Sequence, residues 1–502
     1  MEMASNRLLL VALSALVCSS AFAQAQQGKP DQLQQGRPGQ VAKGNPTAGT
    51  ELPLVSTETY EASRIDTSTF FPQIDNTFRY RWNKPEHEQQ LPLFANTNSR
   101  AKLGETLPYP RTKVEQLFPG MGATGWTPPD PDIAVGPNHI VQVVNSSIAF
   151  FTKAGTNQFQ QTAVNFFTNE ISTFIFDPKV FYDRINDRFV IVFLDKANSP
   201  RTSYLLVAVS DDSDPNGTWY QYAIDVKVID PSDSAELWLD YPGWGYNQDA
   251  YICAGNMFGW TVGWRMAQYV SIRSASVLGG GAAVVDKFQD TGSISMQVAS
   301  VYDDTETRAF AGGKINSSTV SLIAFTGLAS SPAAFRNYVG VPASTSPGNA
   351  PSTNGQTLST VGGRIFNLAW QPGNLATAHA FANGGTIDTR WYEFNTNNWP
   401  SVGTPSYNQG GNVTSGSRAL FMPAINYNDF GDLGMMLTGS STTVTADLMV
   451  AGRTACDPVG TFGTPVTVET SAGNNFTQGR WGDYFGVERD PVDGYTFWGT
   501  GE

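Results

Sequence analysis

The chain contains few of the residues on which several protein classes depend. It has three cysteines and three histidines among 502 residues. Once an N-terminal signal that includes Cys18 is set aside, Cys253 and Cys456 are too few for a disulfide framework, and we expect both to be free thiols. His139 and His379 have no Ser, Cys or second His in a spacing typical of a catalytic triad or a zinc site.

Basic residues and long apolar runs are also scarce. The net charge is -13, and charged residues make up 15% of the chain. Nucleic acids and anionic membranes need clustered Lys and Arg, so the composition predicts no nucleic-acid partner and leaves cations and neutral or polar ligands. Beyond the first residues, no stretch approaches the roughly 20 apolar residues of a membrane helix, so we expect no membrane span.

The N-terminus has the layout of a secretory signal. A basic Arg7 precedes a short apolar run and the small residues Ala21 and Ala23, which predicts a signal over residues 1–23 and secretion to the periplasm or the extracellular space. Residues 24–50 are rich in Gln, Gly and Pro, which is typical of a disordered linker. Residues 51–118 form a mixed N-terminal extension, and residues 119–502 carry a repeat.

The repeat consists of a short strand that opens with a polar residue, a turn with Tyr-Asp, Tyr-Asn or Pro-Asn, and a more apolar strand. Seven copies recur at intervals of 45 to 70 residues, and their opening residues are Asp132, Asp177, Asp240, Gln297, Asn367, Met422 and Asp483. Each interval has room for about four short strands. Four-stranded units repeated around an axis predict an all-β fold, a seven-bladed β-propeller; the alternative is a long β-sandwich.

The last copy provides two strands before the sequence ends, which leaves an unpaired strand edge. One explanation is that the N-terminal extension supplies the ring-closing strands, for example through residues 51–62. The other is that the sequence is a fragment of a longer chain. The sequence does not separate these two explanations.

The opening residues of the copies should meet near the axis, because the innermost strand of each blade begins there. We predict a ligand-binding site at this end, made of the opening residues with Arg364, Arg418 and Arg480 as neutralising donors and Trp238 and Trp481 as stacking surfaces. The predicted residues are Asp132, Asp177, Asp240, Gln297, Asn367, Asp483, Arg364, Arg418, Arg480, Trp238 and Trp481. The alternative is that each Asp only caps the loop before its strand.

A second recurrence, Asp214 to Trp219 and Asp457 to Phe462, combines turn residues with an aromatic. It favours a structural turn whose aromatic side chain fills a gap between blades. The first of these loops also places Asp212, Asp214 and Asn216 at a spacing that suits calcium, although Ala223 stands where an EF-hand has its Glu. Calcium is therefore a candidate cofactor at this loop.

Ser213 to Trp219, SDPNGTW, resembles the Asp-box turn of sialidase-like propellers, with its Asp one residue early. The stretches PPDPDIAVGPNHIVQVVN, RWGDYFGVERDP and TFWGTGE resemble a group of secreted bacterial β-propeller proteins, and this likeness covers most of residues 118–502. The resemblance implies a propeller. A sialidase needs a Tyr nucleophile with a Glu partner, an Asp acid/base and three Arg, and of these only the three Arg have candidates.

These observations give three hypotheses for function. The first is an exported propeller that binds a glycan or an extracellular protein at the face carrying the acidic ring. The second is a glycoside hydrolase or other glycan-cleaving enzyme, sialidase-like, that uses two ring carboxylates as acid and base. The third is an architectural cell-envelope protein. Whether the protein is an enzyme is left open by the sequence.

Overall fold

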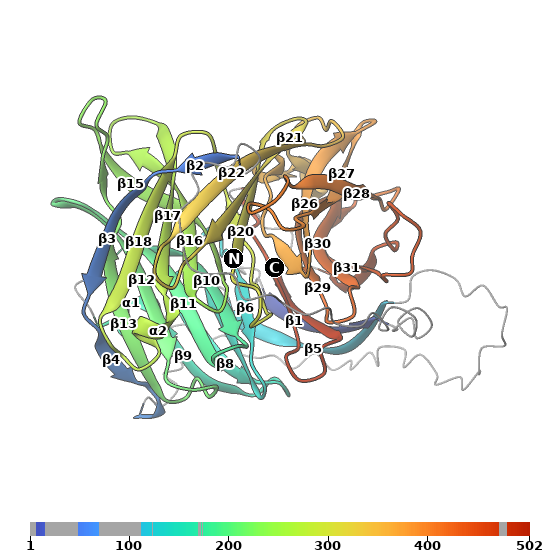
Figure 1. The fold of residues 1–502 in the computed structure, drawn as a ribbon. Helices are drawn as coiled ribbons and strands as arrows, with labels where there is room; N and C mark the ends of the chain where they lie inside the picture. The colour runs from blue at the N-terminus through green and yellow to red at the C-terminus, as the bar shows by residue number, and fades with distance from the viewer. Residues whose placement is uncertain are drawn as a thin grey trace, which may run out of the picture.

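The computed structural model describes residues 7–15, 49–69, 112–122, 124–168, 172, 174–470 and 479–501. These residues form antiparallel sheets around a common axis, so the chain is an all-β β-propeller, as predicted (Figure 1). Within these ranges, helical structure is limited to short turns, which are α1 (Ala163–Phe166), α2 (Ser274–Val277), η2 (Thr67–Thr69), η3 (Thr353–Gly355) and η4 (Val361–Gly363).

Three blades come from the first half of the ring, and the strands of each run outward from the axis in chain order. The first contains β6 (Asp132–Val135), β7 (His139–Val144), β8 (Ser147–Thr152) and β9 (Asn157–Thr162). The second contains β10 (Ile175–Asp183), β11 (Arg188–Asn198), β12 (Arg201–Ser210) and β13 (Thr218–Asp225). The third contains β14 (Val228–Ile229), β15 (Glu236–Tyr246), β16 (Ala250–Gly259), β17 (Trp264–Arg273) and β18 (Ala283–Asp290).

Three further blades complete the second half in the same way. The fourth contains β19 (Gln297–Val298), β20 (Ala309–Asn316), β21 (Thr319–Thr326) and β22 (Ala333–Gly340). The fifth contains β25 (Ala369–Gln371), β26 (Asn374–Asn383), β27 (Thr386–Asn395) and β28 (Ser406–Val413). The sixth contains β29 (Ala419–Tyr427), β30 (Leu433–Ser441), β31 (Val444–Arg453) and β32 (Val466–Thr470), and β23 (Ala350–Pro351) pairs separately with β24 (Thr357–Leu358).

The last copy of the repeat does not form a blade from its own strands. It supplies β33 (Gly486–Arg489) and β34 (Thr496–Gly501), and the sheet is completed by β1 (Arg7–Ala15) and β5 (Thr112–Gly122). This closing sheet lies between the sixth and first blades. On the side of the sixth blade, Asn426 Nδ2 donates to the Val487 carbonyl over 2.9 Å. The predicted count of seven blades was therefore wrong: six blades are built from the repeat's own strands, and a sheet of distant strands closes the ring.

Residues 49–69 form a belt along the outer edges of three blades (Figure 1). Strand β2 (Thr50–Leu52) pairs with β22, β3 (Leu54–Tyr60) with β18, and β4 (Ser63–Asp66) with β13. These strands cover the outermost N–H and C=O groups of their sheets, which would otherwise be open edges. The segment 51–62 thus adds outer strands to the fourth and third blades, while β1 and β5 complete the closing sheet.

Strand β1 lies inside the predicted signal, residues 1–23. A chain cleaved after Ala23 would lack this strand, so signal cleavage and the four-stranded closing sheet exclude each other in one molecule. Secretion stays a prediction. The linker predicted over residues 24–50 lies outside the described residues, apart from residues 49 and 50.

Burial decreases from the innermost to the outermost strand in several blades. Every residue of β10 and β29 is buried, whereas β28 and β32 are mostly exposed or half-buried. Neighbouring blades pack through large side chains, such as Phe181 of β10 against Trp244 of β15, with ring centroids 5.3 Å apart. Cys253 is a buried free thiol, as expected, but Cys456 is disulfide-bonded, so that part of the prediction was wrong.

Candidate functional site

Four blades share a backbone feature where their innermost strands begin. A residue with positive φ precedes a proline in each, and these residues are Asp130, Asp177, Tyr241 and Met422, with φ between 48° and 58°. Proline cannot donate to the ladder, and the register shifts at this point in β10, β15 and β29, as in a β-bulge. The bulge fixes the alignment of the copies: Asp130, not Asp132, is the counterpart of Asp177.

The acidic residues at these strand starts come together as predicted. We call Asp130, Asp177, Asp240 and Asp483 the acidic mouth. Asp177 interacts electrostatically with the other three carboxylates. The convergence that the sequence predicted is therefore present, with Asp130 in the place given to Asp132.

Asp130 and Asp177 of the acidic mouth accept hydrogen bonds from within the protein. Asp130 Oδ1 accepts a hydrogen bond from the Asp483 N–H over 2.6 Å, and its Oδ2 accepts one from Asn145 Nδ2 over 2.7 Å. Asp177 Oδ2 accepts from the N–H of Tyr241 on the next blade over 3.3 Å. The contacts with Asp483 and Tyr241 join neighbouring sheets, whereas the contact with Asn145 lies within the first blade.

Burial raises the pKa values of three carboxyls in the acidic mouth, those of Asp130, Asp177 and Asp240. For Asp130 and Asp177, desolvation is the main cause, and repulsion by the neighbouring carboxylates adds to it. The pKa of Asp240 is also raised by burial, while Lys196 and Arg364 oppose that shift. These three carboxyls therefore hold a proton more readily than exposed aspartates do.

Aromatic side chains fill the centre of the acidic mouth. Tyr241, Met422, Trp481 and Tyr484 are buried in one apolar cluster, and the Tyr241 hydroxyl donates to the Asp483 carbonyl over 3.3 Å. Two predicted arginines reach this end: Arg480 forms an ion pair with Asp483, and the Arg364 guanidinium lies 5.1 Å from the centre of the Tyr241 ring. Trp481, which the sequence predicted as a stacking surface, is instead buried in the core.

Other predicted residues lie elsewhere along the ring. Arg418 pairs with Asp447 and donates to Thr467 Oγ1 over 2.8 Å, both within the sixth blade, so it is not a donor at the acidic mouth. Asn367 joins two blades, because its Oδ1 accepts from the Ile425 N–H over 3.1 Å. Asp132 does the same through the Val180 N–H, also over 3.1 Å.

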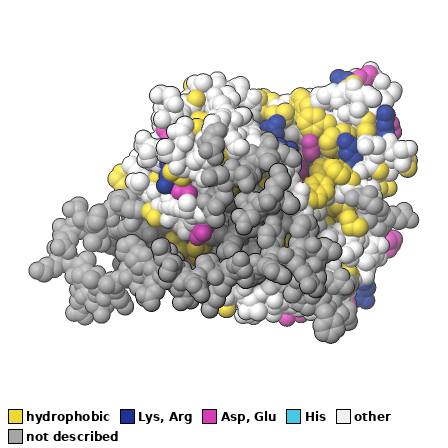
Figure 2. Space-filling model, turned by 180° about the vertical axis from the view of Figure 1, so that it is seen from behind, with side chains coloured by type: hydrophobic (Ala, Val, Ile, Leu, Met, Phe, Trp, Pro, Cys, Tyr) yellow, Lys and Arg dark blue, Asp and Glu magenta, His cyan; other side chains and the backbone are white. Residues whose placement is uncertain are grey.

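Trp238 belongs to a row of aromatic side chains beside the acidic mouth. Ring centroids follow one another at 5.0 to 6.2 Å through Trp126, Phe174, Phe176, Trp238 and Phe258. The Lys196 ammonium lies 3.4 Å from the centre of the Trp238 ring. Seen from behind, hydrophobic side chains gather beside basic and acidic ones on the side of the molecule that carries β15 to β18 (Figure 2). Ligand binding at this surface stays a prediction.

The channel between the two ends of the ring is narrow and polar. Its cavity of about 40 Å³ is lined by Asp132, Lys179, Gln297 and Glu488, among others. Lys179 Nζ lies 4.0 Å from Asp132 Oδ2, and the pKa of Glu488 is raised to about 8 by burial and by repulsion from Asp132. A cavity of this size suits a few water molecules rather than a sugar.

A larger pocket opens at the opposite end, where the innermost strands finish. It has a volume of about 550 Å³ and is lined by the turns that follow β10, β19, β25 and β29 and by the end of β33. We call it the arginine pocket. Its lining residues are Arg184, Ile185, Tyr302, Asp303, Asp304, Trp370, Gln371, Pro372, Asn428, Asp429 and Arg489.

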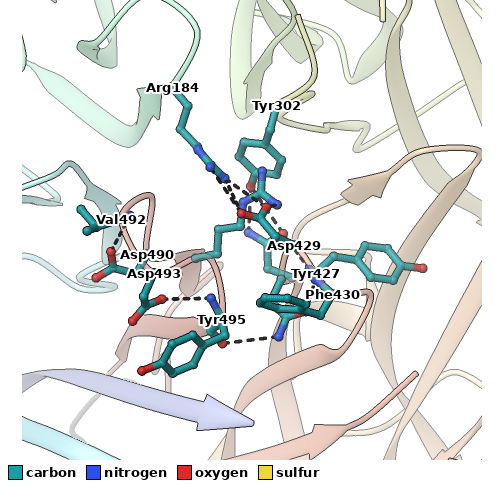
Figure 3. A network of polar contacts seen from close by, with 12 residues as sticks. Arg184, Tyr302, Tyr427, Asp429, Phe430, Asp490, Val492, Asp493 and Tyr495 are labelled. Atoms are coloured by element: carbon teal, nitrogen blue, oxygen red, sulfur yellow. Dashed lines mark hydrogen bonds and ion pairs between the residues drawn. The ribbon is translucent and has the colours of Figure 1, made fainter. Parts of the chain in front are cut away.

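One carboxylate holds two guanidinium groups in the arginine pocket (Figure 3). Arg184 Nη1 lies 3.2 Å from Asp429 Oδ1, and Arg489 pairs with the same carboxylate. The Arg489 guanidinium also lies 3.6 Å from the centre of the Tyr302 ring, and burial lowers its pKa. Because the guanidiniums are held in place, their remaining N–H groups are presented in fixed positions.

Two buried donors in the arginine pocket have no partner. Among the described residues, neither the indole N–H of Trp370 nor Nε of Arg489 has a hydrogen-bond acceptor, although these residues are only 3% and 8% exposed. A buried donor without an acceptor costs about 1–3 kcal/mol. Both residues line the arginine pocket, with these two nitrogen atoms buried in its wall.

The sequence contained a signal for this pocket that the alignment of opening residues did not use. The turn of the repeat places a polar or charged residue after an aromatic, as in Tyr302-Asp303 and in Tyr427-Asn428-Asp429. The first polar residue closes the turn: Asn428 Oδ1 accepts from the N–H groups of Phe430 and Asp432, both over 2.9 Å. The next residues, including Asp304 and Asp429, face the pocket.

The calcium candidates form a compact exposed turn. Asp212 Oδ1 accepts from the Asp214 N–H over 2.7 Å, and Asp214 Oδ1 accepts from the Asn216 N–H over 2.9 Å. In the part of the chain that is described, no group of three or more His, Cys, Asp or Glu side chains is placed to hold a metal. Calcium at this loop stays a prediction.

The aromatic residues of both recurring turns are structural. Trp219 is fully buried, and its Nε1 donates to the Pro215 carbonyl over 2.9 Å. Phe462, in the second copy, packs against Trp391 with ring centroids 5.7 Å apart. These contacts agree with the turn structure that the sequence predicted.

No protein-family profile and no curated protein sequence matches the chain. Solved structures that resemble it include an ulvan lyase, which is a polysaccharide lyase. The two are 10% identical with a TM-score of 0.38, and the match covers 68% of this chain and 81% of the lyase. A Trypanosoma rangeli sialidase is 10% identical with a TM-score of 0.35, and the match covers 64% of this chain and 53% of the sialidase. The propeller domain of the Trilobed protease from Pyrococcus furiosus is 8% identical with a TM-score of 0.32. The match covers 70% of this chain and 98% of that domain. Likeness at this level assigns no ligand or reaction.

Among the described residues, no helix is long and apolar enough to cross a membrane.

Proposed function

We propose that this propeller binds a glycan in the arginine pocket without cleaving it. The observation that carries the proposal is a cavity of about 550 Å³ lined by two guanidiniums that Asp429 holds in place, with the unpaired donors Trp370 Nε1 and Arg489 Nε buried in its wall. Sites for small ligands typically have volumes of about 300–1,000 Å³ and a few fixed polar groups. A sugar unit fits this description, because its hydroxyl and ring oxygens accept hydrogen bonds from such donors.

Acceptors for sugar hydroxyls are present in the same pocket. Asp304 is exposed, and Asp303 and Gln371 are half-buried, so carboxylate and amide oxygens lie beside the two arginines. A wall with both donors and acceptors matches a polyhydroxylated ligand better than a purely apolar one. The indole of Trp370 adds an aromatic surface.

The arginine pocket is favoured over the acidic mouth for a physical reason. At the acidic mouth, Asp130 and Asp177 accept hydrogen bonds from backbone and amide N–H groups, and Tyr241 and Trp481 fill the centre. Binding there would have to displace these contacts. In the arginine pocket, a ligand would enter a cavity that is already present, with the guanidiniums of Arg184 and Arg489 in its wall.

The first test replaces Trp370 by Phe, which removes the N–H and keeps an aromatic ring. We expect the affinity for a glycan identified on a mixed glycan array to fall roughly 5- to 10-fold, the loss of about one hydrogen bond, and thermal stability to fall because the smaller ring leaves a void at a buried position. The measurements are isothermal titration calorimetry and thermal unfolding.

Trp391→Phe is the matched control. Trp391 is also fully buried with an unpaired indole N–H among the described residues, but it lies in the fifth blade against Phe462. This variant should bind as the parent does. An equal loss of glycan affinity in both variants would contradict binding in the arginine pocket. Glycan cleavage products detected by chromatography would replace the binding proposal with the hydrolase alternative.

A further inference from the structure

Two turns beside the arginine pocket carry exposed aromatic side chains. Phe430, after β29, is 42% exposed, and Tyr495, before β34, is 39% exposed. The turns are joined directly: the Asp429 N–H donates to the Gly494 carbonyl over 2.8 Å, and Asn428 Nδ2 donates to the Tyr495 carbonyl over 3.4 Å. Figure 3 shows Phe430 and Tyr495 on the same side of Asp429. We call these two side chains the aromatic rim.

The backbone of the aromatic rim is held in place on both turns. The Phe430 N–H donates to Asn428 Oδ1, and the Tyr495 N–H donates to Asp493 Oδ1, each over 2.9 Å. The rim therefore does not depend on a flexible loop for its position. Asn428 and Asp429 line the arginine pocket and belong to the turn that presents Phe430, so this turn connects the pocket to the rim, although Phe430 and Tyr495 do not line the pocket themselves.

We infer that the aromatic rim binds further sugar units of an oligosaccharide whose first unit lies in the arginine pocket. This inference rests on the proposed function. The C–H faces of sugar rings pack against aromatic rings, so each added unit that reaches the rim gains contact area. A chain of units that leaves the pocket across Asp429 meets Phe430 or Tyr495 next.

The charges of the site point to a neutral oligosaccharide. The charged lining of the arginine pocket consists of Arg184 and Arg489 against Asp303, Asp304 and Asp429. Asp429 already pairs with both arginines, and the chain as a whole carries a net charge of -13. A polyanion would be repelled by this charge, whereas a neutral glycan needs only the hydrogen bonds that the pocket offers.

The test uses an array of neutral gluco-, xylo-, manno- and galacto-oligosaccharides from one to six units, with polygalacturonate and alginate oligosaccharides as acidic probes. We expect binding to a neutral series, with affinity rising about 10-fold between one and four units. Phe430→Ala and Tyr495→Ala should each remove most of this rise and leave the affinity for the shortest bound sugar within about 2-fold.

Tyr338→Ala is the matched control, because Tyr338 is 47% exposed on β22, in the fourth blade, away from the pocket. It should keep the full dependence on length. Thermal unfolding of each variant shows whether it remains folded, which exposed substitutions should allow.

The outcomes separate the two proposals. Absence of binding to every probe, or binding that Trp370→Phe leaves unchanged, overturns the proposed function. Binding that Trp370→Phe weakens, but that neither depends on length nor responds to Phe430→Ala and Tyr495→Ala, overturns the aromatic rim alone. A preference for the acidic probes overturns the neutral ligand class.

Discussion

The two ends of the ring use the same innermost strands in opposite ways. At the acidic mouth, where the strands begin, carboxylates accept hydrogen bonds from neighbouring blades and aromatic side chains fill the centre. At the arginine pocket, where the strands finish, a cavity of about 550 Å³ retains buried donors without acceptors. Converging polar residues thus hold the ring together at one end and remain available to a ligand at the other.

The largest effect expected from this difference is on stability, at the acidic mouth. Replacing Asp130 by Ala removes the acceptor of the Asp483 N–H and one of the two acceptors of Asn145 Nδ2, which keeps its hydrogen bond to the Pro128 carbonyl. We expect the free energy of unfolding to fall by about 2–5 kcal/mol, measured by chemical denaturation, because each unpaired buried donor costs about 1–3 kcal/mol.

Asp187→Ala is the control for that change. Asp187 also has a positive φ, of 55°, but it is exposed. Its replacement should change the free energy of unfolding by less than about 1 kcal/mol. Glycan affinity should be unchanged in folded Asp130→Ala protein, and a loss of affinity there would move the binding site to the acidic mouth.

The next prediction concerns the channel between the two ends, and it is tested by the pH dependence of the free energy of unfolding. The pKa of Glu488 is about 8 in the folded protein, above its ordinary value of 4.5. The folded state therefore holds a proton that the unfolded state releases, and the free energy of unfolding falls as pH rises from about 4.5 to about 8. Glu488→Gln should remove the part of this decrease in the free energy of unfolding that Glu488 causes.

We expect the Glu488→Gln variant to match the parent near pH 4.5 and to be more stable near pH 8, by an amount on the order of 1–3 kcal/mol. Denaturation curves across this pH range measure the difference. Glu51→Gln, at an exposed position on β2, should follow the parent throughout. A Glu488→Gln curve that runs parallel to the parent would show that this carboxyl does not titrate in the window.

A smaller effect on stability is expected at the arginine pocket, with a larger one on binding. Asp429→Asn removes the charge that holds Arg184 and Arg489. The Asp429 side chain is 37% exposed, so we expect the free energy of unfolding to fall by only about 1 kcal/mol. Glycan affinity should fall roughly 10-fold, because the guanidiniums lose their fixed positions.

Asp233→Asn, at an exposed ion pair with Arg265, is the comparison for Asp429→Asn. It should change neither stability nor affinity measurably. Calorimetric titration of both variants with the same glycan gives the result. If the two variants bound alike, the pairing of Asp429 with the arginines would have no part in recognition.

The sequence predicted the propeller well because each copy carries its own local pattern. The polar strand start, the turn with Asp or Asn and the apolar second strand recur in the six blades. The count failed at the last copy, because β1 and β5 come from residues 7–15 and 112–122 and have no counterpart in the repeat. Pairing between such distant segments leaves no local periodicity to detect.

The candidate site was predictable only in part. The convergence of Asp177, Asp240 and Asp483 follows from the geometry of a propeller, and the structure contains it. The role of Asp130 depends on its positive φ before Pro131, a backbone feature that shifts the alignment of the copies by two residues. The unpaired donors of Trp370 and Arg489 could not be predicted, because they result from packing that leaves no acceptor within reach.

The most direct test of the central claim is a crystal structure of the protein with a bound neutral oligosaccharide. We predict a sugar unit in the arginine pocket, with oxygen atoms within hydrogen-bond distance of Trp370 Nε1 and Arg489 Nε. A sugar bound at the acidic mouth, between Asp177 and Asp240, with the arginine pocket empty, would contradict the account.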